Sequence, residues 1–116
     1  MLKLTKTVHL LHLEEEANQI LSCFKPLIQY IRDKNNRKVG VLLGYKDADG
    51  ELMIGWSKCN IKRDKFNRDL AITKAFSRRE LNAGKWADGL PQSLRETYQS
   101  FCDRCVRFFY KNGMVD

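Results

Sequence analysis

Apolar residues in the first third of the chain recur with the period of a helix. From about residue 13 to residue 33 they fall along one face, at Ala17, Ile20, Leu21, Phe24, Leu27, Ile28 and Ile31, a pattern that predicts a helix. Pro26 removes one helical hydrogen bond and crowds the preceding turn, so we expect a kink or a break near Lys25. Residues 1–12 fit either the start of this helix or an extra N-terminal strand.

Two β-rich segments flank an Asp-Gly turn in the middle of the chain. Residues 39–45 and 52–56 are rich in apolar and aromatic side chains, and residues 46–51 between them are polar. Asp49-Gly50 supplies the positive φ that a tight turn needs, so the sequence predicts a β-hairpin. An isolated hairpin is marginal in water, so this one must pack on helices or pair with a further strand.

Two more helices are predicted in the second half of the chain. The first runs from about Phe66 to Leu81, with Asp64 as its expected N-cap. Its apolar residues lie on two sides, which predicts that it is sandwiched between the hairpin and another element. The second helix follows a loop over residues 82–90, and Ser93 and Glu96 have the spacing of a capping box at its start.

The last helix carries apolar residues at alternating spacings of four and three, as in a narrow packing seam. These residues are Leu94, Tyr98, Phe101, Cys105 and Phe108. Asn112-Gly113 is the expected stop of the helix. The order helix, β-hairpin, helix, helix predicts an α+β fold, with residues 1–116 as a single domain.

The size and composition are those of one globular domain. The chain has 116 residues, of which 43% are hydrophobic and 30% charged. No apolar run approaches the ~20 residues of a membrane span, and the N-terminus lacks the apolar core of a signal peptide. We therefore expect no membrane partner, a cytoplasmic location and reduced thiols at all four cysteines.

The net charge of +7 is concentrated in one segment. Residues 58–79 contain eight lysines and arginines against two aspartates, so nearly the whole excess lies in 22 residues. A cluster of cations binds phosphates because it releases their condensed counterions, whereas scattered cations only aid solubility. The alternative is a solvated helix whose cations merely border its apolar faces.

We therefore predict a site for an anionic ligand on this segment. Trp56 can stack on a base, although core packing is the stronger alternative because it ends an apolar strand. Ser57, Cys59 and Asn60 either hydrogen-bond a ligand or terminate the strand. The predicted site residues are Trp56, Lys58, Asn60, Lys62, Arg63, Lys65, Arg68, Lys74, Arg78 and Arg79.

The cysteine and histidine motifs fall short of a metal or redox site. Cys102-x-x-Cys105 lies in the middle of a helix, away from the N-terminal dipole that stabilises a thiolate, so we interpret both residues as core or boundary thiols. His9-x-x-His12 lacks a matching pair of zinc ligands. The sequence also lacks a glycine-rich phosphate loop and a nucleophile–base set. We therefore predict no catalytic residues, no metal, no cofactor and no enzyme activity.

Motifs across residues 38–110 follow the pattern of one protein family. Gly55-Trp56-Ser57-Lys58-Cys59-Asn60 is followed by Lys62 to Phe66, then by Ala71, Ile72, Ala75 and Arg78, and later by Leu90 to Leu94, Tyr98, Phe101, Arg104, Cys105, Arg107 and Phe108. This pattern resembles a family of small, uncharacterised bacteriophage accessory proteins. Lys58 stands where that family carries leucine, and an extra cation interrupts its lysine–aspartate pair.

The resemblance implies a biological setting and brings no catalytic residues. Small phage accessory proteins commonly counter host defence by binding, as anti-CRISPR inhibitors do. We therefore expect a non-enzymatic counter-defence protein in the host cytoplasm. Its basic segment would engage nucleic acid, a host nucleic-acid-binding defence complex or a nucleotide messenger.

Two other functions remain as alternatives. The first is a protein–protein inhibitor that blocks a host enzyme through an apolar surface at Trp86, Phe109 and Tyr110. The second is a nucleic-acid-processing enzyme. A homodimer built on the last helix is compatible with either binding hypothesis.

Overall fold

The computed structural model describes the backbone of residues 2–82 and 86–110, and the side chains from residue 12 onward. Its elements are α1 (Leu2–Phe24), β1 (Leu27–Arg32), β2 (Lys38–Lys46), β3 (Leu52–Lys58), α2 (Arg68–Ser77), β4 (Glu80–Leu81), the 3-10 turn η1 (Gln92–Leu94) and α3 (Arg95–Tyr110). The strands form one antiparallel sheet in the order β1-β2-β3-β4. The predicted α+β class is confirmed.

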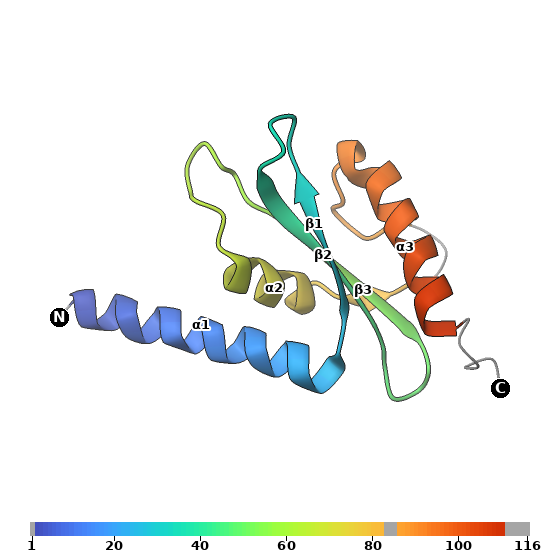
Figure 1. The fold of residues 1–116 in the computed structure, drawn as a ribbon, viewed down its shortest axis with the longest axis horizontal. Helices are drawn as coiled ribbons and strands as arrows, with labels where there is room; N and C mark the ends of the chain where they lie inside the picture. Colours follow the sequence, from blue (N-terminus) through green and yellow to red (C-terminus); the bar gives the residue numbers. More distant parts are fainter. Residues whose placement is uncertain (1, 83–85, 111–116) are drawn as a thin grey trace.

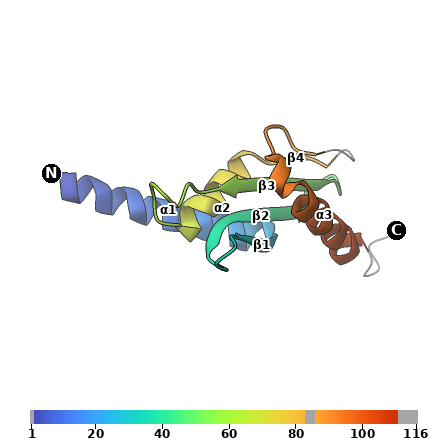
Figure 2. The same cartoon turned by 90° about the horizontal axis from the view of Figure 1, so that it is seen from above.

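The sheet lies between two helical layers (Figures 1 and 2). Helices α1 and α2 cover one face and α3 covers the other. The central strand β2 is buried on both sides: Leu42 packs toward α3, whereas Val41 and Leu43 pack toward α1 and α2. The described side chains therefore form an apolar cluster on each face of the sheet.

The first helix ends earlier than its apolar pattern predicts. The expected break at Lys25 is confirmed, because that residue adopts a φ of 48° directly before Pro26. Residues 27–32 form strand β1, so the prediction of helix as far as residue 33 is wrong there. The physical reason is that Ile28 and Ile31 fit a strand as well as a helix: they pack on opposite faces of the sheet. At the other end the helix begins at Leu2, which excludes the extra N-terminal strand.

The predicted hairpin is confirmed as β2 and β3, whose last pair before the turn is Lys46 with Leu52. Gly50 has a φ of +80°, a conformation that glycine adopts without steric cost. The Asp47 carboxylate accepts hydrogen bonds from the backbone amides of Asp49 and Glu51, at 3.0 and 2.8 Å. These bonds hold the turn closed.

Helix α2 is shorter than predicted and has a different cap. The side chain of Asn67 accepts a hydrogen bond from the backbone N–H of Leu70 at 3.0 Å, so Asn67, and not Asp64, is the N-cap. The helix stops at Ser77, and residues 80–81 form β4. Its sandwiched position is confirmed, because α2 contacts α1 on one side and strands β2 and β3 on the other.

The last helix follows part of its predicted seam. Leu94, Tyr98, Phe101 and Cys105 are buried, whereas Phe108 is 52% exposed. After Cys105 the next residue to pack on the core is Phe109, four positions on, and not Phe108. The cause is that a straight helix drifts relative to a strict seven-residue repeat. The capping-box prediction is wrong: Ser93 lies inside η1, whose N-cap is Pro91. The predicted stop at Asn112-Gly113 lies outside the described residues.

Candidate anion-binding surface

The loop between β3 and α2, residues 59–67, carries the centre of the predicted site. Two apolar side chains fix it to the fold. Ile61 packs against the cluster on the α3 face of the sheet, and Phe66 packs against the cluster on the α1 and α2 face. The loop therefore crosses the end of the sheet between two anchors, and the cations between those anchors are presented outward.

Hydrogen bonds inside the loop explain its polar residues. The backbone N–H of Cys59 bonds to the carbonyl of Val39 at 2.7 Å, which extends the sheet by one residue. The Asn60 carbonyl accepts the amides of Arg63 and Asp64, and its side-chain oxygen accepts the amide of Lys62. Of the two roles considered for Cys59 and Asn60, the structure shows the one that ends the strand and shapes the loop.

Ser57 serves the fold and not the surface. Its side chain is buried and donates a hydrogen bond to the carbonyl oxygen of Ala71 in α2, at 2.8 Å. This contact ties the end of β3 to the first turns of the helix.

The turn between β1 and β2 brings in cations that the sequence did not single out. The Asp33 carboxylate accepts the backbone amides of Asn35 and Arg37 and pairs with the Arg37 guanidinium at 2.9 Å. Hydrogen bonding from the Arg37 amide lowers the pKa of Asp33. Next to this turn, the Lys38 ammonium lies 4.1 Å from the centre of the Tyr30 ring. Arg37 and Lys38 thus face the β3–α2 loop across the end of the sheet.

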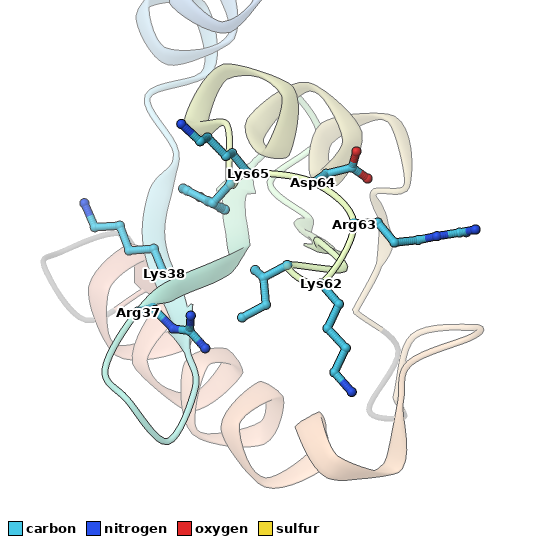
Figure 3. A pocket seen from close by; sticks show the side chains of 8 residues that line it. Arg37, Lys38, Lys62, Arg63, Asp64 and Lys65 are labelled. Carbon is cyan, nitrogen blue, oxygen red and sulfur yellow. The ribbon is translucent and has the colours of Figure 1, made fainter.

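Two adjoining hollows lie between these segments. The first, of about 390 Å³, lies between the turn and the loop (Figure 3) and is lined by Arg37, Lys38, Ile61, Lys62, Arg63, Asp64, Lys65 and Phe66. The second, of about 540 Å³, is lined by Asp33, Val39, Trp56, Lys58, Cys59, Asn60, Ile61, Lys62, Arg78 and Pro91. Ile61 and Lys62 belong to both. We call the two together the basic surface.

The structure gathers most of the predicted site residues, but not all. Trp56, Lys58, Asn60, Lys62, Arg63, Lys65 and Arg78 line one hollow or the other. The remaining three, Arg68, Lys74 and Arg79, line neither hollow. The Arg79 guanidinium lies over the ring of Phe76, 4.0 Å from its centre, on the side of the molecule where α1 packs.

Trp56 combines the two roles that the sequence allowed. It packs against the α3-side core as a half-buried residue and also lines the second hollow. The Arg78 guanidinium stands 4.7 Å from the centre of its ring. A cation over an aromatic face is attracted by the ring quadrupole, so this contact holds Arg78 at the edge of the hollow.

The other chemical motifs lie away from the basic surface. Cys102 and Cys105 are buried in the α3 core, and burial raises their thiol pKa values to about 11 and about 12. The predicted packing role of both is therefore confirmed. The His9 side chain lies outside the described residues, and His12 pairs with Glu16 at 2.8 Å. Among the described side chains, no three metal-ligating groups lie together.

None of the helices in the described ranges is long and apolar enough to cross a membrane. Comparisons of the chain with protein families, curated proteins and solved structures found no significant match.

Proposed function

We propose that this protein is a non-enzymatic binding protein whose basic surface holds a phosphate-bearing partner, with nucleic acid as the first candidate. The observation that carries the proposal is the convergence of cations from separate segments on two adjoining hollows. Seven cationic side chains line them, against two acidic ones: Arg37, Lys38, Lys58, Lys62, Arg63, Lys65 and Arg78, with Asp33 and Asp64.

The charges on this surface are largely uncompensated. Among the described residues, Arg37 is the one cation of the seven that forms an ion pair, and its partner is Asp33. Like charges held close together repel one another, and a bound polyanion relieves that repulsion while releasing its own counterions. Binding of a phosphate backbone is the outcome that this arrangement favours.

The surface is also held in place before a partner arrives. Ile61 and Phe66 anchor the β3–α2 loop, and the Asp33–Arg37 contacts close the facing turn. Ordered segments lose less conformational entropy on binding than flexible ones, so fixed loops favour affinity. Long lysine and arginine side chains on a fixed backbone can still adapt to phosphates at several positions.

The resemblance to phage accessory proteins supports a biological setting for this activity. In that setting the protein acts in the host cytoplasm against a defence system, by occupying the nucleic acid that the system uses. A host nucleic-acid-binding complex and a nucleotide messenger are the other anionic partners that the same charges would attract.

An apolar inhibitory surface has less support from the packing. Phe109 and Tyr110 pack on the α3-side core, and the Tyr110 hydroxyl donates a hydrogen bond to the Gly50 carbonyl at 2.9 Å. Trp86 is 46% exposed, with the Arg95 guanidinium 4.4 Å from its ring centre. The three residues therefore do not form one continuous exposed patch.

The direct test is binding of the purified protein to random single- and double-stranded DNA and RNA at low and moderate salt. We expect binding that weakens steeply as salt rises, because counterion release supplies the free energy. Absence of binding even at low salt would contradict a nucleic-acid partner. It would direct the search to a host protein from nuclease-treated lysate.

A further inference from the structure

The two hollows of the basic surface differ in chemical character. The first is bordered by charged side chains from the turn and the loop (Figure 3). The second is lined by four apolar residues, Val39, Trp56, Ile61 and Pro91, together with polar Cys59 and Asn60, three cations, Lys58, Lys62 and Arg78, and the acidic Asp33. Its volume of about 540 Å³ lies in the range of ~300–1,000 Å³ that is usual for sites of small organic groups. A phosphate would gain nothing from the apolar residues, whereas a planar base would.

Trp56 and Arg78 give this hollow two flat groups. The guanidinium lies over the indole ring at 4.7 Å, and both residues line the hollow. Nucleic-acid bases stack on aromatic rings and on arginine guanidinium planes, whatever the identity of the base. A base can therefore stack on the guanidinium that covers the indole, or on the indole once Arg78 moves aside, in either case without sequence-specific readout.

The two hollows meet in a way that suits the two chemical parts of a nucleotide, its base and its phosphate. Ile61 and Lys62 line both, so an apolar and a cationic compartment meet at one residue pair. A nucleotide also joins an apolar, planar part to a charged one. A base in the second hollow would leave its phosphates near Lys62 and the cations of the first hollow, with Arg63 and Lys65 next along the loop.

We infer that the basic surface takes single-stranded nucleic acid, with one unpaired base in the Trp56 hollow and the adjoining phosphates on the cationic hollow. This inference rests on the proposed function and specifies its ligand. In a duplex the bases are paired and stacked, so one could enter the hollow only after it was extruded, at a substantial energetic cost. The preference for single strands follows from that cost.

A ligand-side experiment tests the inference without altering the protein. The probes are oligothymidylate and oligouridylate of about 12 nucleotides, a length within the usual footprint of small single-strand-binding domains. Each is compared with its duplex and with an abasic chain that has the same number of phosphates. We expect the abasic chain and the duplex to bind about five- to one-hundred-fold more weakly, the range that stacking of one base supplies.

The outcomes separate this inference from the proposed function. Equal affinity for the single strand and for either comparison chain would contradict a base in the hollow while leaving phosphate binding intact. A single strand that binds no more tightly than the free nucleotide monophosphate would also overturn it. No binding of any chain would contradict the proposed function itself.

Tryptophan fluorescence supplies a second readout. The chain has two tryptophans, and Trp86 lines neither hollow. In a Trp86→Phe variant the emission therefore reports on Trp56. We expect the single strand to change this emission and the abasic chain to leave it nearly unchanged, because only a base can stack on the guanidinium that covers the indole or displace it from the ring. Equal changes in emission with both chains would contradict the inference.

Discussion

The hydroxyl of Ser57 donates a hydrogen bond to the main-chain carbonyl oxygen of Ala71, 2.8 Å away and shielded from solvent. One turn further along α2, the carbonyl oxygen of Ala75 lies so close to Gly55 that a Cβ atom on this glycine would be only 1.9 Å from it. The helix backbone thus rests directly on β3. This contact fixes where α2 begins, and so fixes the loop that carries the cations of the basic surface.

Replacing Ser57 with alanine removes this bond from a buried site. We expect a loss of about 1 kcal/mol in the free energy of unfolding, the usual net value of one such hydrogen bond. Denaturant unfolding followed by circular dichroism measures it. Ser93→Ala, at an exposed position inside η1, is the matched control and should change stability little. Similar losses in both variants would contradict the anchoring role of Ser57.

The cap of α2 offers a choice between two neighbouring residues. Asn67→Ala removes the acceptor for the Leu70 amide, so we expect a loss of about 1 kcal/mol in unfolding free energy. The side chain of Asp64 is exposed and lies outside the helix, so Asp64→Ala should be close to neutral. Thermal or denaturant unfolding of both variants measures these losses. A larger loss for Asp64→Ala than for Asn67→Ala would show that the helix starts earlier.

The buried thiols predict a loss of stability at alkaline pH. Burial raises the pKa of Cys102 to about 11 and that of Cys105 to about 12, from the ordinary value of 9.0. A raised pKa means that the folded state favours the neutral thiol. The two thiols therefore make their full contribution to the free energy of unfolding below pH 9. This contribution falls as pH rises from about 9 toward 12. The slope is at most ~1.4 kcal/mol per pH unit for each thiol.

Unfolding at pH 8 and pH 10 under reducing conditions measures this effect. A Cys102→Ala, Cys105→Ala double variant separates it from the titration of other groups. The double variant is expected to be less stable at both pH values, because truncation leaves a cavity. Its stability should nevertheless fall less between them, and an unchanged fall would contradict the assignment to the thiols.

The hairpin turn and the end of the first helix could be predicted from the sequence because the local chemistry of single residues determines them. Gly50 marks the hairpin, and Pro26 marks the end of α1. Strand β1 was predicted as helix because the positions of Leu27, Ile28 and Ile31 fit the period of a helix as well as that of a strand. The loop cations are equally plain in the sequence. The facing cations Arg37 and Lys38 were not singled out, because the turn that carries them is closed by strand β1, which was predicted as helix.

Arg37 and Lys38 illustrate that limit. Antiparallel pairing of β2 with β3 sets Gly40 opposite Lys58, so the start of β2 lies beside the loop that follows β3. The predicted hairpin already implies this neighbourhood, since its strands pair outward from the Asp49-Gly50 turn. Residues 34–37 are polar and fit a loop, but only the pairing of β1 with β2 closes them into the turn that positions both cations.

Lys38 tests a part of the basic surface that was not among the predicted site residues. Lys38→Gln should weaken nucleic-acid binding a few-fold and reduce its salt dependence by about one counterion. Lys34→Gln in the same turn removes an equal charge from a residue that lines neither hollow, and it serves as the control. Indistinguishable affinities for the two variants would remove Lys38 from the site.

Phosphate binding at the basic surface should depend on the charges of the β3–α2 loop. The most direct measurement is the slope of log affinity against log salt for Lys62→Gln, Arg63→Gln, compared with Arg104→Gln, Arg107→Gln. The second pair carries the same charge loss on α3, away from both hollows. We predict that the loop variant loses about two units of slope and about ten-fold in affinity, while the α3 variant resembles the unmodified protein. Equal slopes in all three folded proteins would contradict phosphate binding at this loop.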